Sequence, residues 1–196
     1  MQAEASCAAL PSVELLMPAT WNRLELGPDG RAASIDRIVE LTMKQGPEFE
    51  EARDRMRTEL ETAAELGAAS GATLAYTYWA APSGKLASAS LFVALVDGGR
   101  ASDSAPGSED LPAAIAARYG GEVRALSAGR AARVRRRVRR PSDSGSGPEA
   151  EIVTWYVPHA SGRRLAVLTF STPNVGLADE LGQVFDALAD TLRWTA

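Results

Sequence analysis

Two amphipathic helical segments enclose a series of short strands in this sequence, and this arrangement limits the fold more than any other feature. The segment at residues 48–66 places Phe49, Met56 and Leu60 on one face at helical spacing, with charged residues opposite. The segment at residues 176–192 has an apolar stripe made of Leu177, Leu181, Val184, Phe185, Leu188 and Leu192. Such helices need a surface that buries their apolar faces, and a sheet between them is expected to supply it.

The strands are expected at residues 15–26, 73–80, 86–96, 123–126, 131–140, 151–158 and 163–171. Pro18 interrupts the first of these runs, which is typical of an edge strand. A turn is predicted at residues 27–30, a short helix from Ser34 to Gln45, and another at residues 110–118. Strands in series bounded by helices predict an α+β protein, an α/β/α sandwich with a central antiparallel sheet.

The composition excludes several classes of protein. The chain has 196 residues, and its 21 Lys and Arg against 25 Asp and Glu give a net charge of −4. A chain with this balance is not attracted as a whole to nucleic acid or to an anionic membrane. Cys7 and His159 are the single residues of their types, so neither a disulfide framework nor a multi-cysteine zinc site is possible within the chain. We therefore expect no cofactor and no metal site.

The chain is expected to form one domain over residues 13–196, after a flexible leader at residues 1–12. The loops at residues 97–109 and 141–149 are predicted to be mobile, the second because it is rich in Ser and Gly. No run approaches the roughly 18 to 20 apolar residues that span a bilayer, and no basic residue precedes the first apolar stretch. We therefore expect a cytoplasmic protein without membrane contact. Its use of 19 Arg against 2 Lys suggests a GC-rich bacterial genome.

Both ends of the chain resemble the Mog1/PsbP-like superfamily. The similarity lies in LLMPATWNRLEL at residues 15–26 and in RRLAVLTFSTPNVGLADELGQVFDALADTLRW at residues 163–194. The superfamily includes Ran-GTPase-binding Mog1, the photosystem subunit PsbP, LpqN-type lipoproteins, the DcrB group and the related Eag-type chaperones of secreted effectors. The resemblance implies an α/β/α sandwich that acts as a binding or accessory module and catalyses no reaction. This chain departs from the exported members in its leader, and from all of them in one arginine-rich strand.

The residues that could carry catalysis do not form a recognisable constellation. A nucleophilic triad needs a base beside its nucleophile, but His159 lies in a predicted hairpin turn and Cys7 in the leader. We interpret His159 as a surface turn residue. Asp179, Asp186 and Asp190 share the helix face opposite the leucine stripe, and we interpret them as a solvated face, with an acidic docking face as the alternative.

The most unusual stretch carries six arginines within residues 133–140. As a strand, it places Arg136 and three apolar residues on one face, and on the other Arg133, Arg135, Arg137 and Arg139. Glu149 and Glu151 are candidates to neutralise this arginine row. Three interpretations remain open: a solvated face, a docking surface for an acidic protein, or a nucleic-acid or phosphate site. The third is disfavoured because no aromatic residues alternate with the arginines.

These observations predict a non-enzymatic accessory or adaptor protein that binds another protein, without catalytic, cofactor-binding or metal-binding residues. The predicted contact residues are Arg133, Arg135, Arg137 and Arg139. A chaperone of a secreted effector is the alternative, by resemblance to the Eag-type proteins. A nucleic-acid or phosphate module and a carboxylate-based hydrolase are weaker alternatives, and no small-molecule substrate is expected. The sequence leaves the partner and the oligomeric state open.

Overall fold

The computed structural model describes residues 11–81, 86–97, 110–139, 149–162 and 164–195. Most of the expected leader and of the two expected mobile loops therefore lies outside the described residues. The parts that are described belong to strands: Ser12 begins β1, Asp97 ends β4 and Glu149 begins β7.

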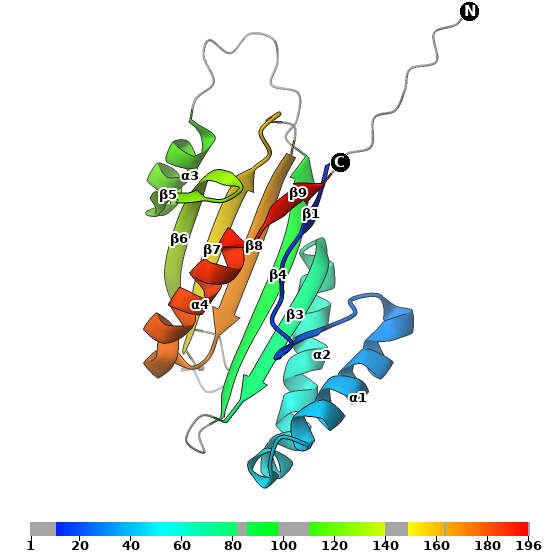
Figure 1. Ribbon diagram of the computed structural model, residues 1–196. Helices are drawn as coiled ribbons and strands as arrows, with labels where there is room; N and C mark the ends of the chain where they lie inside the picture. Colours follow the sequence, from blue (N-terminus) through cyan, green and yellow to red (C-terminus); the bar gives the residue numbers. More distant parts are fainter. Residues whose placement is uncertain (1–10, 82–85, 98–109, 140–148, 163, 196) are drawn as a thin grey trace, which may run out of the picture.

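A seven-stranded antiparallel sheet forms the centre of the molecule (Figure 1). The strand order across the sheet is β2-β3-β4-β8-β7-β6-β5. The strands span Trp21–Arg23 (β2), Ala72–Ala80 (β3), Ala87–Asp97 (β4), Glu122–Leu126 (β5), Gly129–Arg139 (β6), Glu149–Pro158 (β7) and Arg164–Thr172 (β8). Two further strands, β1 (Ser12–Glu14) and β9 (Arg193–Thr195), pair with each other in a small antiparallel sheet. Six of the seven expected strands are confirmed to within a few residues. Of the first, expected at residues 15–26, only Trp21–Arg23 forms a strand, and β1 lies just before the expected range.

Helices lie on both faces of the sheet, as Figure 1 shows. On one face, here the α2 side, α1 (Pro28–Met43), a short 3₁₀ turn η1 (Pro47–Ala52) and α2 (Arg53–Ala69) lie against β2, β3 and β4. The opposite α4 side carries α4 (Ala178–Asp190), which follows the short turn η3 (Val175–Leu177). The helix α3 (Leu111–Tyr119) packs on β5, β6 and β7. The expected α+β class with a central antiparallel sheet is confirmed. Among the described residues, no helix combines the length and the apolar character that crossing a membrane requires.

Each face of the sheet has its own hydrophobic core. The core on the α4 side is centred on Phe170 and Phe185, whose stacked rings have centroids 4.8 Å apart. The core on the α2 side joins residues of α1 and α2, including Ile38 and Met56, to Trp79 of β3. Alternate residues of each central strand point to opposite faces, so the strands β3 and β4 contribute to both cores.

The first helix begins earlier than the sequence suggested. The expected turn at residues 27–30 is the first turn of α1, because Pro28 occupies the first helical position, where its fixed φ and missing N–H are tolerated. Ser34 is therefore not a helix cap. It is buried within α1, where its hydroxyl accepts a hydrogen bond from the Glu25 N–H and donates one to the Arg23 carbonyl. This contact fixes α1 against the segment that follows β2.

Candidate functional site

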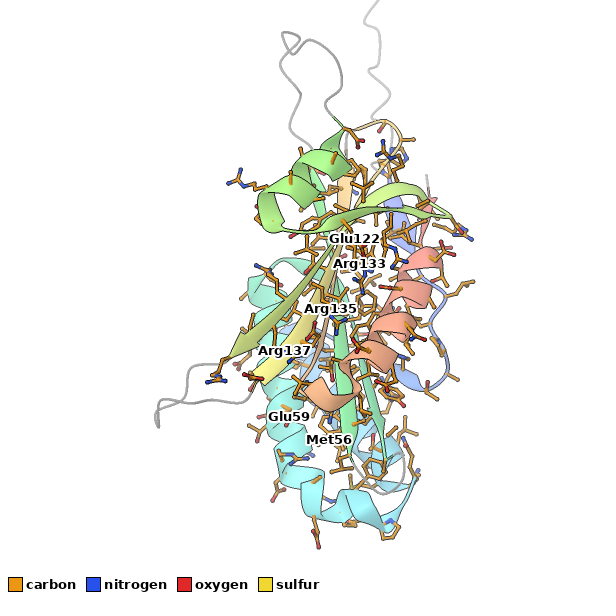
Figure 2. The ribbon with its side chains drawn as sticks, turned by 90° about the vertical axis from the view of Figure 1, so that its left-hand side faces the viewer. Met56, Glu59, Glu122, Arg133, Arg135 and Arg137 are labelled. Carbon is orange, nitrogen blue, oxygen red and sulfur yellow. The ribbon has the colours of Figure 1, made fainter. Side chains whose placement is uncertain are left out.

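The arginine row of β6 (Arg133, Arg135, Arg137 and Arg139) lies on the α4 side of the sheet, with the alternation that the sequence predicted. Figure 2 shows three of its members in sequence along the strand, beside α4. The exposed fraction of their side chains rises along the row, from 12% for Arg133 through 35% and 54% to 62% for Arg139. The row is therefore half-buried at the end near β5 and open at the other end.

Every arginine of the row forms an ion pair within the chain. The Arg133 Nε donates to Asp186 Oδ1 at 2.7 Å, and its Nη1 lies 3.3 Å from Glu122. The other pairs join Arg135 to Glu151 and Asp179, Arg137 to Glu151, and Arg139 to Glu149. The predicted neutralisation by Glu149 and Glu151 is confirmed. The row holds β5, β7 and α4 together, and its charge is balanced by carboxylates from all three elements.

The acidic face of α4 is not simply solvated, and this corrects the sequence interpretation. The side chain of Asp186 is only 26% exposed, and its carboxylate accepts hydrogen bonds from both Arg124 and Arg133. Asp190 accepts a hydrogen bond from the Ser127 N–H at 2.6 Å. The β5–β6 hairpin lies alongside α4, so residues that a helical projection places outward face a second element. Asp179, with a side chain 82% exposed, and Asp190 are exposed, as the interpretation of a solvated face expects, but each of them also has a partner within the chain.

His159 lies in the turn between β7 and β8, as the sequence predicted. Its Nδ1 is 2.7 Å from the Ser161 hydroxyl, and its ring meets the edge of Trp194 with centroids 5.0 Å apart. Trp194 is partly buried beside the core of the α4 side, while Phe185 is fully buried. The burial of Phe185 agrees with the apolar stripe expected at residues 176–192, whereas Trp194 is covered only in part. Cys7 lies outside the described residues.

A strip of the sheet on the α2 side is left uncovered, and this is the most distinctive surface in the described part of the chain. We name it the open sheet face and define it by nine partly exposed residues of β4, β7 and β8: Ser90, Phe92, Ala94, Val96, Ile152, Leu165, Val167, Thr169 and Ser171. The intervening residues Leu91, Val93, Leu168 and Phe170, which point to the α4 side, are fully buried. The same strands are therefore covered on one face and partly exposed on the other.

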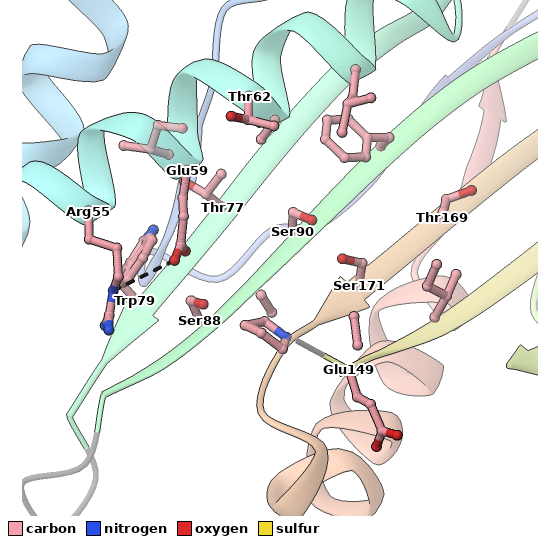
Figure 3. A pocket seen from close by; sticks show the side chains of 18 residues that line it. Arg55, Glu59, Thr62, Thr77, Trp79, Ser88, Ser90, Glu149, Thr169 and Ser171 are labelled. Carbon is pink, nitrogen blue, oxygen red and sulfur yellow. Dashed lines mark ion pairs between the residues drawn. The ribbon is translucent and has the colours of Figure 1, made fainter. Parts of the chain in front are cut away.

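The open sheet face deepens into a cavity of about 550 Å³ next to α2 (Figure 3). Hydroxyl groups of Ser88, Ser90, Thr169 and Ser171 line its floor, and Thr62 and Leu66 belong to the α2 wall. The Thr77 hydroxyl, on a residue 3% exposed, also borders the cavity and has no hydrogen-bond partner. Unsatisfied buried hydroxyls are rare in proteins. The cavity can thus accept a polar group as well as apolar ones.

Large apolar side chains border the open sheet face. Leu66 of α2 is 56% exposed and Val96 at the end of β4 is 48% exposed. Tyr119 at the end of α3 is 46% exposed, and its ring stacks in parallel on Tyr156 of β7 with centroids 6.1 Å apart. Single apolar residues are ordinary on protein surfaces, but here Leu66 lines the cavity and Val96 continues the partly exposed row of β4, and such a contiguous apolar surface marks a binding site. This surface was not predicted from the sequence, because residue alternation along a strand does not show whether a helix covers it.

Two carboxylates line the cavity, and both are already paired. Glu59 lies 3.7 Å from Arg55, and Glu149 is bonded to Arg139. The hydrogen bond from Arg139 holds the pKa of Glu149 below its usual value. A general acid of a glycosidase needs a raised pKa, so Glu149 is unsuited to that role. Within the described residues, no three His, Cys, Asp or Glu side chains cluster in a way that could hold a metal ion.

Comparison with known proteins assigns no family and no function to the chain. No protein-family model matches the chain, and no curated protein matches it. The open sheet face and the arginine row are therefore the features of this chain that bear on its function.

Proposed function

We propose that this protein is a non-enzymatic adaptor that binds another protein through its open sheet face. The observation that carries the proposal is the partly exposed open sheet face itself, which has exposed Val96 at one end and a cavity lined by exposed Leu66 beside α2. A helix normally covers each apolar face of a sheet in a layered fold. A partner that buried this strip would complete the layer, and burial of apolar surface is the main favourable term in protein association.

The arginine row is a less favourable docking surface than the open sheet face, and this supports the choice of the open sheet face. The sequence predicted Arg133, Arg135, Arg137 and Arg139 as the contact residues, and each of them has a carboxylate partner within the chain. A partner that docked there would have to replace ion pairs that already exist, and such an exchange contributes little to affinity. Arg137 and Arg139 are the most exposed members, so docking at that end stays a secondary prediction.

The proposal extends to the fold family. Helices on both sides of an antiparallel sheet, with a closing helix that packs on its central strands, support the Mog1/PsbP-like assignment that the motifs at both ends suggested. By this resemblance the protein would be an accessory module, and a chaperone of a secreted effector is one form that such a module takes. Fold analogy supports these roles only by association.

Affinity capture of partner proteins from a lysate of the native host tests the proposal. Two exposed valines on opposite sides of the sheet supply the test variant and the control. Val96 borders the open sheet face, and Val184, 41% exposed, lies on α4 on the other side of the sheet. We expect Val96→Asp combined with Leu66→Asp to abolish capture of proteins that the unmodified protein retains. The control Val184→Asp should retain them. Unchanged capture by a folded Val96→Asp, Leu66→Asp protein would contradict the proposal.

A further inference from the structure

The uncovered strip has the width of one helix. On one side, α2 reaches β4, where a side-chain atom added at Gly67 would meet the ring of Phe92 at 2.8 Å. On the other side, α3 covers β6 and the adjoining end of β7. Between them lie β8 and the facing halves of β4 and β7. Two to three strand spacings of about 4.8 Å give roughly 10 to 14 Å, which matches a helix diameter of about 10 to 12 Å.

The border of the strip along β6 and α3 is positively charged. Arg136 is the arginine of β6 that points to the α2 side, directly across from Ile152 of the open sheet face. Among the described residues, neither Arg136 nor Arg118 of α3 forms an ion pair with a carboxylate, and both are exposed. By contrast, Arg130 at the beginning of β6 is paired with Asp110. Two unpaired cations thus border one side of the strip.

Aromatic rings connect Arg118, one of these two cations, to the strip. The Arg118 guanidinium lies over the Tyr119 ring, 5.7 Å from its centroid, and Tyr119 stacks on Tyr156. Tyr156 lies on the same face of β7 as Ile152 of the open sheet face. Exposed arginine and tyrosine side chains beside an apolar surface are the residue types that dominate binding energy at interfaces.

The opposite border of the strip is formed by α2, and there positive and negative charges balance near the cavity. Arg55 and Glu59 of α2 form an ion pair there, and the floor of the strip carries only apolar and hydroxyl side chains. Among the described residues that line the cavity, charge is therefore compensated, and the uncompensated charge beside the strip lies along the border formed by β6 and α3. That charge is positive.

We infer that the open sheet face binds an amphipathic helix whose polar side carries carboxylates, which face Arg136 and Arg118. The inference depends on the proposed function and names the chemistry of the partner segment. The apolar face of the helix would lie on Phe92, Val96 and Val167, in the manner of a helix held in a groove. Carboxylates and guanidinium groups form the strongest charge-assisted hydrogen bonds among side chains.

Two synthetic peptides test the inference on the full chain. Each has about 18 residues, or five helical turns, with the same Leu and Ala face, and its polar positions are either all Glu or all Lys. Fluorescence anisotropy of labelled peptides would measure the dissociation constants at low ionic strength. The protein has a net charge of −4, so its overall field favours the Lys peptide. We nevertheless expect the Glu peptide to bind at least tenfold more tightly.

Charge-reversal variants locate the preference. Arg136→Glu should raise the dissociation constant of the Glu peptide at least tenfold. Lys44→Glu, at the end of α1, makes the same change of charge away from the strip and should change the affinity less than twofold. Thermal unfolding would show that both variants fold, and Arg136→Gln serves in place of Arg136→Glu if the latter does not.

The possible outcomes separate the inference from the proposed function. Equal binding of both peptides that Val96→Asp abolishes would overturn the acidic preference and leave the proposed function supported. Failure of both peptides to bind would overturn the inference, and capture from the host would then decide the proposed function alone. Tighter binding of a single-stranded DNA oligonucleotide, lost in Arg136→Glu, would also overturn it in favour of a nucleic-acid partner.

Discussion

The carboxylate of Glu151 lies between the guanidinium groups of Arg135 and Arg137. Its side chain is 4% exposed, whereas those of the two arginines are 35% and 54% exposed. A buried carboxylate is tolerated only with charged or hydrogen-bonding partners, since its loss of hydration must be compensated. The two arginines therefore act mainly on the stability of the sheet, and their pairing with Glu151 raises the pKa of Arg135.

Reversal of both arginines should destabilise the protein. In Arg135→Glu, Arg137→Glu, the buried Glu151 loses both partners and meets two new negative charges. Breaking a buried ion pair costs about 3 to 5 kcal/mol, and we expect a loss of at least about 2 kcal/mol because the arginines are partly hydrated. Urea unfolding followed by circular dichroism measures it. Arg136→Glu on the other face of β6 is the control and should stay within about 0.5 kcal/mol. Equal stability of the two proteins would show that Glu151 does not need its partners.

The arginine row shows how far a residue pattern can be interpreted. Strand alternation was enough to predict which arginines share a face, and Glu149 and Glu151 were near enough in sequence to be named as their partners. Asp186, which binds Arg133, comes 53 residues later. Its contact depends on how α4 crosses the sheet, and no local pattern encodes that crossing. Arg136 was placed correctly on the opposite face, but its role depends on an uncovered surface that only the assembled layers reveal.

Among the elements, α4 depends most on one side chain. Phe185 is fully buried, stacks on Phe170 and meets Trp21 edge-on with centroids 6.4 Å apart. Its neighbour Val184 is 41% exposed, although the sequence placed it in the same apolar stripe. The apolar stripe was thus predicted correctly except at Val184. Consecutive residues of a helix point about 100° apart, so Val184 points away from the sheet that Phe185 faces.

Truncation of Phe185 should threaten the whole fold. Phe185→Ala removes a ring that connects α4 with β2 and β8, and such a change costs about 3 to 5 kcal/mol. Typical domains are stable by only about 5 to 15 kcal/mol, so the melting temperature should fall steeply. Calorimetry would measure this, with Val184→Ala as the control that hardly shifts it. A small effect of Phe185→Ala would mean that α4 is not held by its apolar face.

At the scale of the whole molecule, the sequence predicted the layers but not where they leave the sheet uncovered. The strands were recognised from residue pattern and turn signals, and both amphipathic helices from their periodicity. The open sheet face alternates like any half-buried strand surface, with Ser90, Phe92 and Ala94 in one row. Whether such a row is covered depends on where α2 and α3 come to lie. That position is set by contacts such as Gly67 against Phe92, which bring together distant parts of the chain.

The pairing of β1 with β9 joins segments near the two ends of the chain. The hydroxyls of Ser12 and Thr195 are 2.6 Å apart although the residues are separated by 183 positions. Most strands of the large sheet pair with a neighbour in sequence, and β4 with β8 is the long-range exception. Closing a long loop costs more entropy than closing a short one. We therefore expect β1 and β9 to pair after the rate-limiting step of folding.

Folding kinetics would show this order. Val13, 8% exposed, lies opposite Trp194 in the small sheet. In stopped-flow experiments, Val13→Ala should leave the folding rate almost unchanged and accelerate unfolding, which corresponds to a φ-value near zero. Val153→Ala in the central strand β7 should slow folding instead. A high φ-value at Val13 would mean that the ends of the chain meet early, and the closure of the molecule would then guide its folding rather than complete it.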